Sequence, residues 1–176
     1  GESHGDLVTD YSNDINPYNA RRLSLAGELR KAIDNDELAL HFQPKFCSKN
    51  GKISGMEALL RWTHCEYGFI PPDEFIPIAE QTGVINPLTK WVIDRALSQL
   101  SELREMGFEL SVAVNISAIN LKEKNFPRIV QEGLQKYKVP PGLLSLEVTE
   151  TAMMDDPALA LSALRELNSL GIRLSI

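Results

Sequence analysis

Apolar strand patterns alternate with helical patterns along most of this 176-residue chain. Residues 108–117 are almost continuously apolar, as expected of a strand that is covered on both faces, and residues 143–150 are expected to form the next strand. Apolar residues recur at helical intervals in three other segments, residues 88–106, 126–137 and 155–171. Strands that alternate with helices in this way predict a parallel sheet, either doubly wound or closed into a barrel.

A hairpin is expected before this alternation begins. Residues 38–44 and 53–62 both have strand patterns, and the connection between them is too short for a crossover helix. The dipeptide Asn50-Gly51 in this connection is a strong signal for a tight turn. We therefore expect these two strands to be antiparallel.

The domain is expected to begin near Arg21. From there, leucine and isoleucine residues recur at near-helical intervals and predict a helix that ends around residues 34–36. Residues 1–20 are rich in Gly, Ser, Asn, Asp and Pro and follow neither apolar period, so we expect a linker or the tail of an upstream domain. A further short helix is expected from about Pro72, ended by Gly83.

Charge and cysteine count argue against several classes of function. Lys and Arg number 18 against 24 Asp and Glu, and the net charge of −6 should repel DNA or RNA polymers. No apolar stretch approaches the roughly 20 residues of a membrane span. We expect a cytoplasmic domain, although the parent protein could be anchored through other segments. With only Cys47 and Cys65, neither a disulfide framework nor a zinc site beside His64 is expected.

Three polar side chains stand near the ends of three expected strands. Glu57, Asn115 and Glu147 each follow apolar neighbours, and the carboxyl ends of parallel strands meet on one side of a sheet. Any one of them could simply face a solvated groove. Together they indicate a cationic partner, because burying an unpaired carboxylate is costly. Oxygen donors of this kind suit Mg²⁺ or Mn²⁺.

Five short motifs follow one another along the chain. They are FQPK at 42–45, MEALLRW at 56–62, FIPIAE at 75–80, VNIS at 114–117 and LEVTE at 146–150. In order and spacing they resemble the EAL-domain family of cyclic di-GMP phosphodiesterases. The resemblance covers residues 21–176 and implies an α/β fold, a TIM-like (β/α)8 barrel with an antiparallel first strand. Because the family pattern continues beyond Ile176, we expect an incomplete barrel, the N-terminal two-thirds of the domain.

The resemblance implies roles for four acidic or amide residues. Glu57, Asn115 and Glu147 match the family's metal ligands, with two Mg²⁺ or Mn²⁺ ions expected in the intact domain. Glu150 matches a glutamate that supports an active-site loop rather than binding metal directly. Glu57 and Glu150 are therefore the expected catalytic residues.

Three further residues match positions that contact the cyclic dinucleotide in the family. They are Gln43, Leu59 and Arg61, and Arg61 is expected to reach a phosphate. Strand parity places Glu57, Leu59 and Arg61 on one face of a regular strand. An arginine beside a phosphate is chemically sensible, since its planar fork can bind two oxygens.

The activity implied by the resemblance is metal-dependent hydrolysis of cyclic di-GMP to linear pGpG in bacterial second-messenger signalling. The family also implies a homodimer and an upstream regulatory domain, often GGDEF, of which residues 1–20 could be the tail. The family's further metal ligands and an essential lysine follow the last residue of this sequence, so we expect little or no turnover from these 176 residues alone. Two alternatives remain open: a catalytically inactive cyclic di-GMP receptor that uses the same pocket, and a pure interaction module.

Overall fold

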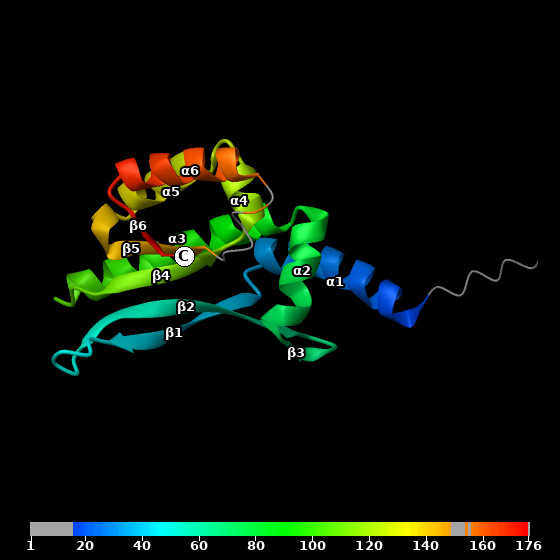
Figure 1. The fold of residues 1–176 in the computed structure, drawn as a ribbon. Coiled ribbons are helices and arrows are strands. Elements are labelled where there is room, and N and C mark those ends of the chain that lie inside the picture. The colour runs from blue at the N-terminus through cyan, green and yellow to red at the C-terminus, as the bar shows by residue number, and fades with distance from the viewer. Residues whose placement is uncertain (1–15, 149–153, 155, 176) are drawn as a thin grey trace, which may run out of the picture.

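A mixed sheet with helices packed on it forms the body of the computed structural model, which describes residues 16–148, 154 and 156–175. The strand order in this part of the chain is β1-β2-β4-β5-β6, with β3 paired to β2. In Figure 1, α3, α5 and α6 lie on one side of β4 and β5, whereas α1 and α2 lie together near one end of β2.

The elements have the following bounds. The strands are β1 (Leu38–Phe46), β2 (Ile53–His64), β3 (Gly68–Ile70), β4 (Ser111–Ile116), β5 (Leu144–Val148) and β6 (Arg173–Ser175). The helices are α1 (Pro17–Asp34), α2 (Pro72–Thr82), α3 (Ile85–Glu105), α4 (Ala118–Lys122), α5 (Phe126–Lys136) and α6 (Pro157–Ser169), with a 3-10 turn η1 (Pro141–Leu143). Within the described residues, no helix combines the length and apolar character needed to cross a membrane.

The first two strands form the predicted antiparallel hairpin. Their register places Gln43 opposite Glu57. The backbone N–H of Cys47 donates to the carbonyl oxygen of Lys52 at 2.8 Å and closes the turn. Gly51 adopts a φ of 66°, which a residue without a Cβ reaches at no steric cost.

The strands that follow the hairpin are parallel, as the alternation predicts. β2 pairs with β4, β4 with β5 and β5 with β6, all in the parallel sense. Helices lie between the paired strands in the chain order. The carboxyl ends of β2, β4, β5 and β6 therefore share one edge of the sheet.

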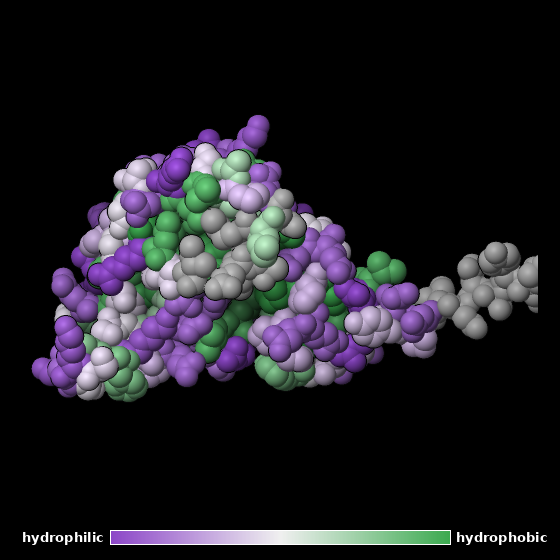
Figure 2. Space-filling model, viewed as in Figure 1, coloured by the Kyte–Doolittle hydropathy of each residue, from purple (hydrophilic) through white to green (hydrophobic). Residues whose placement is uncertain are grey.

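Alternate strand residues face the helical layer. Ala58 of β2 and Val112 and Val114 of β4 are buried in a core cluster with side chains of α3, α5 and α6. Because successive side chains of a strand point to opposite faces, Glu57 and Asn115 point away from this cluster. Figure 2 shows hydrophilic residues over most of one face of the molecule, with hydrophobic residues visible near its centre.

Two helices begin earlier than the sequence pattern predicts. α1 starts at Pro17 rather than Arg21, because the side chain of Asn16 caps the helix and proline fits its first turn. α3 starts at Ile85 rather than Leu88. The sequence pattern also missed α4 and β3, which have 5 and 3 residues and are too short to display a period.

Gly55 lies where β2 approaches β4 closely. A Cβ at this position would lie 2.4 Å from Oγ and 2.9 Å from the carbonyl oxygen of Ser111, its register partner. Gly55→Ala should therefore lower the free energy of unfolding by about 1–3 kcal/mol, the usual effect of overpacking. Urea denaturation measures this change. Gly142→Ala, which meets no atom within 4 Å, is the control, and an equal loss in both variants would contradict the steric explanation.

Asp94 connects α3 to the end of α5. The Nζ of Lys136 donates to Asp94 Oδ1 at 2.7 Å, and the hydroxyl of Tyr137 donates to Oδ2 at 2.9 Å. Partial burial by itself raises the pKa of Asp94, but these hydrogen bonds and the charges of Lys136 and Arg95 outweigh it and hold the pKa below its ordinary value of 3.8. The hydrogen bond to Asp94 is the main reason that the pKa of Lys136 rises to about 12.

The lowered pKa of Asp94 predicts a pH-dependent contribution to stability. A carboxylate whose pKa is depressed by folding stabilises the fold above its unfolded pKa of 3.8, and this contribution disappears as the pH falls through the folded-state pKa. Asp94→Asn should be less stable than the unmodified chain at neutral pH, and the difference should shrink at pH values below 3.8. Urea denaturation across this range tests it, with Asp34→Asn as an exposed control on α1. A difference that stays constant into strong acid would contradict the prediction.

Candidate functional site

Glu57, Asn115 and Glu147 lie on three neighbouring parallel strands. Glu57 is on β2, Asn115 on β4 and Glu147 on β5, and the last two are direct register partners. The side-chain amide of Asn115 donates from Nδ2 to Glu57 Oε1 at 2.9 Å. The fold therefore brings together the three oxygen-bearing side chains that the sequence singles out.

A lysine that the sequence analysis did not select joins this group. Lys45 of β1 donates from Nζ to Glu147 Oε1 at 2.5 Å, although β1 and β5 are not neighbours in the sheet. Lys45 is two positions from Gln43, so both side chains leave the same face of β1. That spacing is the sequence signal that could have found Lys45, but it indicates a face and not a partner.

The donor chemistry of this group fits a hard divalent cation. Two carboxylates and one amide offer oxygen atoms, which Mg²⁺ and Mn²⁺ prefer. Both carboxylates already receive positively polarised hydrogens, Glu147 from an ammonium group and Glu57 from an amide. No group of three His, Cys, Asp or Glu side chains in the described part of the chain could hold a metal ion. The oxygen of Asn115 is therefore needed to complete a set of three donors.

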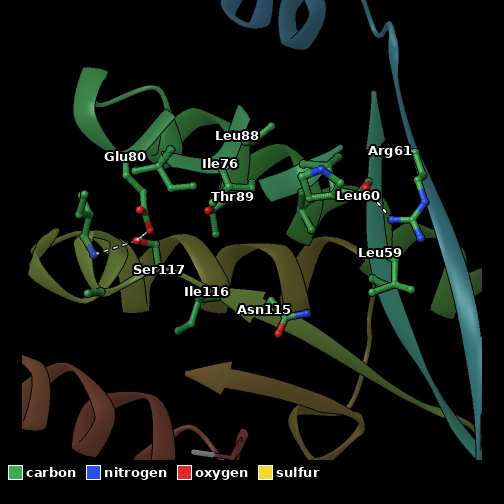
Figure 3. A pocket seen from close by; sticks show the side chains of 16 residues that line it. Leu59, Leu60, Arg61, Ile76, Glu80, Leu88, Thr89, Asn115, Ile116 and Ser117 are labelled. Atoms are coloured by element: carbon green, nitrogen blue, oxygen red, sulfur yellow. Dashed lines mark hydrogen bonds between the residues drawn. The ribbon is translucent and has the colours of Figure 1, made fainter. Parts of the chain in front are cut away.

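A cavity of about 570 Å³ opens beside these residues, between the carboxyl ends of β2 and β4 and the helices α2 and α3. Leu59 and Arg61 line it from β2, and Asn115 lines it from β4. Figure 3 shows these side chains on one side of the cavity and apolar side chains of α2 and α3 on another. Arg61 is half-buried and donates from Nη1 to the carbonyl oxygen of Leu60 at 2.9 Å. The cavity thus combines an apolar wall with a cation and an amide.

Only some of the remaining residues that the sequence predicts for the site line the cavity. Leu59 and Arg61 line the cavity, as described, and lie on the same face of β2 as Glu57. Gln43 is exposed on β1 opposite Glu57, and it is not among the residues that line this cavity. Glu150 lies outside the described residues.

A second polar contact ties the end of β4 to the helices. The hydroxyl of Ser117 donates to Glu80 Oε1 at 2.6 Å, and Figure 3 shows both side chains at the cavity wall. Glu80 and Ser117 belong to the FIPIAE and VNIS motifs. The sequence analysis included both residues in its motifs, but no sequence pattern indicated that their side chains are in contact.

These features define a class of protein: an α/β domain whose candidate site lies at the carboxyl ends of its parallel strands. The family model described as the EAL domain matches residues 26–176. This chain belongs to the EAL domain family, as the five motifs predict.

Three curated relatives indicate the range of its similarity. The chain is 42% identical over 94% of its length to the signaling protein YkoW of Bacillus subtilis. It is 36% identical over 94% to the bifunctional diguanylate cyclase/cyclic di-GMP phosphodiesterase MucR of Pseudomonas aeruginosa, and 38% identical over 88% to the cyclic di-GMP phosphodiesterase PdeR of Escherichia coli. The chain spans 21%, 24% and 23% of the lengths of these three relatives.

Solved structures agree on the fold. The chain is similar to the PaMucR phosphodiesterase in complex with c-di-GMP, with a TM-score of 0.81, 38% identity, and coverage of 87% of this chain and 62% of that one. It is also similar to the cGMP-bound EAL enzyme Bd1971, with a TM-score of 0.80, 30% identity, and coverage of 91% and 45%. The fold is therefore TIM-barrel-like, and the described strands form an open part of such a barrel, as predicted.

Lys45→Met should leave the carboxylate of Glu147 without its cationic partner. Because both partners of this ion pair are partly exposed, we expect the free energy of unfolding to fall by at most about 1 kcal/mol at low salt and by less at high salt. Urea denaturation at the two salt concentrations measures the effect. Lys49→Met removes an exposed charge from the turn between β1 and β2 and is the control. Equal stability of the two variants would contradict a stabilising role for Lys45.

Proposed function

We propose that this chain carries part of the catalytic site of a phosphodiesterase that hydrolyses cyclic di-GMP to linear pGpG in bacterial second-messenger signalling. The observation that carries the proposal is the meeting of Glu57, Asn115 and Glu147 at one edge of the sheet, beside a cavity lined by Leu59 and Arg61. Two of the relatives are named as cyclic di-GMP phosphodiesterases. A similar solved structure is a complex with c-di-GMP.

Glu57, Asn115 and Glu147 are the residues that would hold Mg²⁺ or Mn²⁺, with two ions in the intact domain. Divalent cations supply charge stabilisation at a phosphoryl oxygen and lower the pKa of bound water. The chain itself supplies donors on strands, which hold side chains more rigidly than loops do. The hydrogen bond from Asn115 orients the carboxylate of Glu57. Glu57 is therefore the proposed catalytic carboxylate of this part of the domain.

Substrate contacts are proposed for the residues around the cavity. Arg61 would exchange the carbonyl oxygen of Leu60 for phosphate oxygens, which its planar guanidinium can bind in pairs. Leu59 supplies apolar wall, and the exposed amide of Gln43 offers hydrogen bonds to the dinucleotide. Glu150 would support a loop of the site. Because the chain has a net charge of −6, bound cations would have to neutralise the acidic mouth before a dianion enters.

A second candidate is a cyclic di-GMP receptor without catalytic activity. Lys45 pairs with Glu147 and neutralises its charge, and this contact favours a site that accepts an anionic ligand in the absence of divalent cations. Such a receptor would bind cyclic di-GMP equally well with a chelator or with Mn²⁺ present.

We also propose that the intact protein is a homodimer whose cytoplasmic EAL domain follows a regulatory domain, with residues 1–20 as the linker or as the tail of that domain. The chain spans less than a quarter of the length of YkoW, and MucR is named as a bifunctional protein, so such relatives carry more than this domain. Analytical ultracentrifugation of the intact protein tests the dimer, and a purely monomeric protein would contradict it.

Glu57→Gln tests the proposed metal-dependent hydrolysis. Loss of a charged ligand should weaken Mn²⁺ binding by more than the roughly 10–100-fold that follows loss of an outer-sphere partner. Isothermal titration with Mn²⁺ measures this, and formation of pGpG by the intact protein should fall as well. Glu109→Gln, an exposed change two residues before the start of β4, is the control.

Melting temperatures complete the test. A ligand that binds only the folded state raises the melting temperature as its concentration exceeds Kd. If neither Mn²⁺ nor cyclic di-GMP stabilises the intact protein, the proposed site is wrong and an interaction module is favoured. Stabilisation by cyclic di-GMP that is equal with and without a chelator would favour the receptor.

A further inference from the structure

Asn120 of α4 is a fully buried polar residue at the back of the candidate site. Its Oδ1 accepts two hydrogen bonds, from the hydroxyl of Thr89 at 3.0 Å and from the backbone N–H of Ser117 at 2.9 Å. Its Nδ2 donates to Asn86 Oδ1 at 2.9 Å. Thr89 is itself buried on α3. The amide of Asn120 therefore links α3 to the first turn of α4.

The backbone held by Asn120 directly follows a proposed metal donor. Ser117 is two residues beyond Asn115. Its backbone N–H donates the hydrogen bond that Asn120 Oδ1 accepts. The hydroxyl of Ser117 accepts from the N–H of Ile119 at 3.2 Å and donates to Glu80. The turn that follows β4 is thus held on one side by α3, through Asn120, and on another by α2.

Local helix capping alone does not require the contact with Thr89. The side chain of Ser117 already caps α4, and the N–H of Ser117 is already satisfied by Asn120. Buried polar networks are costly if any member lacks a partner, and an apolar side chain would fill the same space without that risk. When all members are satisfied, such networks restrict a region to one geometry. The hydrogen bond between Thr89 and Asn120 is therefore suited to holding the turn after β4 in one orientation.

We propose that Asn120 and Thr89 are positioning residues for the candidate site. They hold the turn after β4 so that the side-chain amide of Asn115 is directed at Glu57, next to Glu147. This inference rests on the proposed function only for its consequence, the affinity for a divalent cation; the orientation of Asn115 can be measured in the absence of metal.

The test compares two substitutions of nearly the same shape. Thr89→Val removes the hydroxyl that donates to Asn120 and keeps the side-chain volume, whereas Thr89→Ser keeps the hydroxyl. In the metal-free chain, NMR of the side-chain amide of Asn115 reports its hydrogen bond to Glu57. We expect its proton shifts to move toward those of a solvent-exposed amide in Thr89→Val and to stay unchanged in Thr89→Ser.

Metal affinity provides the second readout. Isothermal titration with Mn²⁺ should show a loss on the order of tenfold in Thr89→Val, comparable with loss of an outer-sphere partner, and little loss in Thr89→Ser. A purely structural role would lower the melting temperature of Thr89→Val but leave the Asn115 amide shifts and the Mn²⁺ affinity of the folded chain unchanged. That result would overturn the inference.

The two proposals fail in different ways. If the unmodified chain does not bind Mn²⁺ while Thr89→Val still changes the Asn115 amide shifts, the proposed metal site is wrong and the positioning role stands. If Thr89→Val does not fold, Asn86→Ala and Asn86→Asp replace the pair, because Asn86 is only partly buried and accepts from Asn120. The aspartate keeps the acceptor and should preserve the Asn115 amide shifts, whereas the alanine should change them. Unchanged shifts in both variants would overturn the inference.

Discussion

The parallel pairing of β4 with its two neighbours is the constraint on which the candidate site depends. A slip of one residue would turn Asn115 toward the helical layer and away from Glu57. The close approach of Gly55 and Ser111 restricts the start of this pairing. The paired residues of β2 and β4 end at Ala58 and its partner, and the cavity opens beside Leu59. The pairing of β2 with β4 therefore contains Glu57 and ends one residue before Asn115, and the space beyond its end leaves room for a ligand beside these two side chains.

Grouping two carboxylates at one edge creates an electrostatic problem, which the chain addresses with its own side chains. Lys45 binds Glu147, and the amide of Asn115 donates to Glu57. Both contacts are exchangeable, because neither Lys45 nor Asn115 is buried. A divalent cation can compete for the same oxygen atoms, since it brings a higher charge than an ammonium group. These two contacts thus keep the oxygen atoms grouped without blocking them permanently.

Much of the sheet could be predicted from the sequence because its signals are local. Continuous apolar strands predicted the parallel pairing, and the Asn50-Gly51 turn predicted the hairpin. The grouping of oxygen donors also followed, since the carboxyl ends of parallel strands share one edge. The contact from Lys45 could not be predicted, because it joins strands that are not neighbours and so depends on the curvature of the sheet. No short-range pattern in one sequence encodes that curvature.

The helices contact the backbone next to the site through hydrogen bonds, because the apolar side chains of β4 that pack on the helices point away from the site. Side chains of β4 that meet α3, such as Val114, alternate with those that face the site, such as Asn115. Apolar packing therefore fixes the position of the strand and, through Leu121, of α4, but it does not set the direction of the polar groups in the turn between them. Directional hydrogen bonds at the turn itself, from the backbone N–H of Ser117 to Asn120 and from the Ser117 hydroxyl to Glu80 of α2, set that direction. Apolar packing and hydrogen bonds thus have different roles here, which explains why the buried polar side chains of Thr89 and Asn120 lie at the junction between β4 and α4.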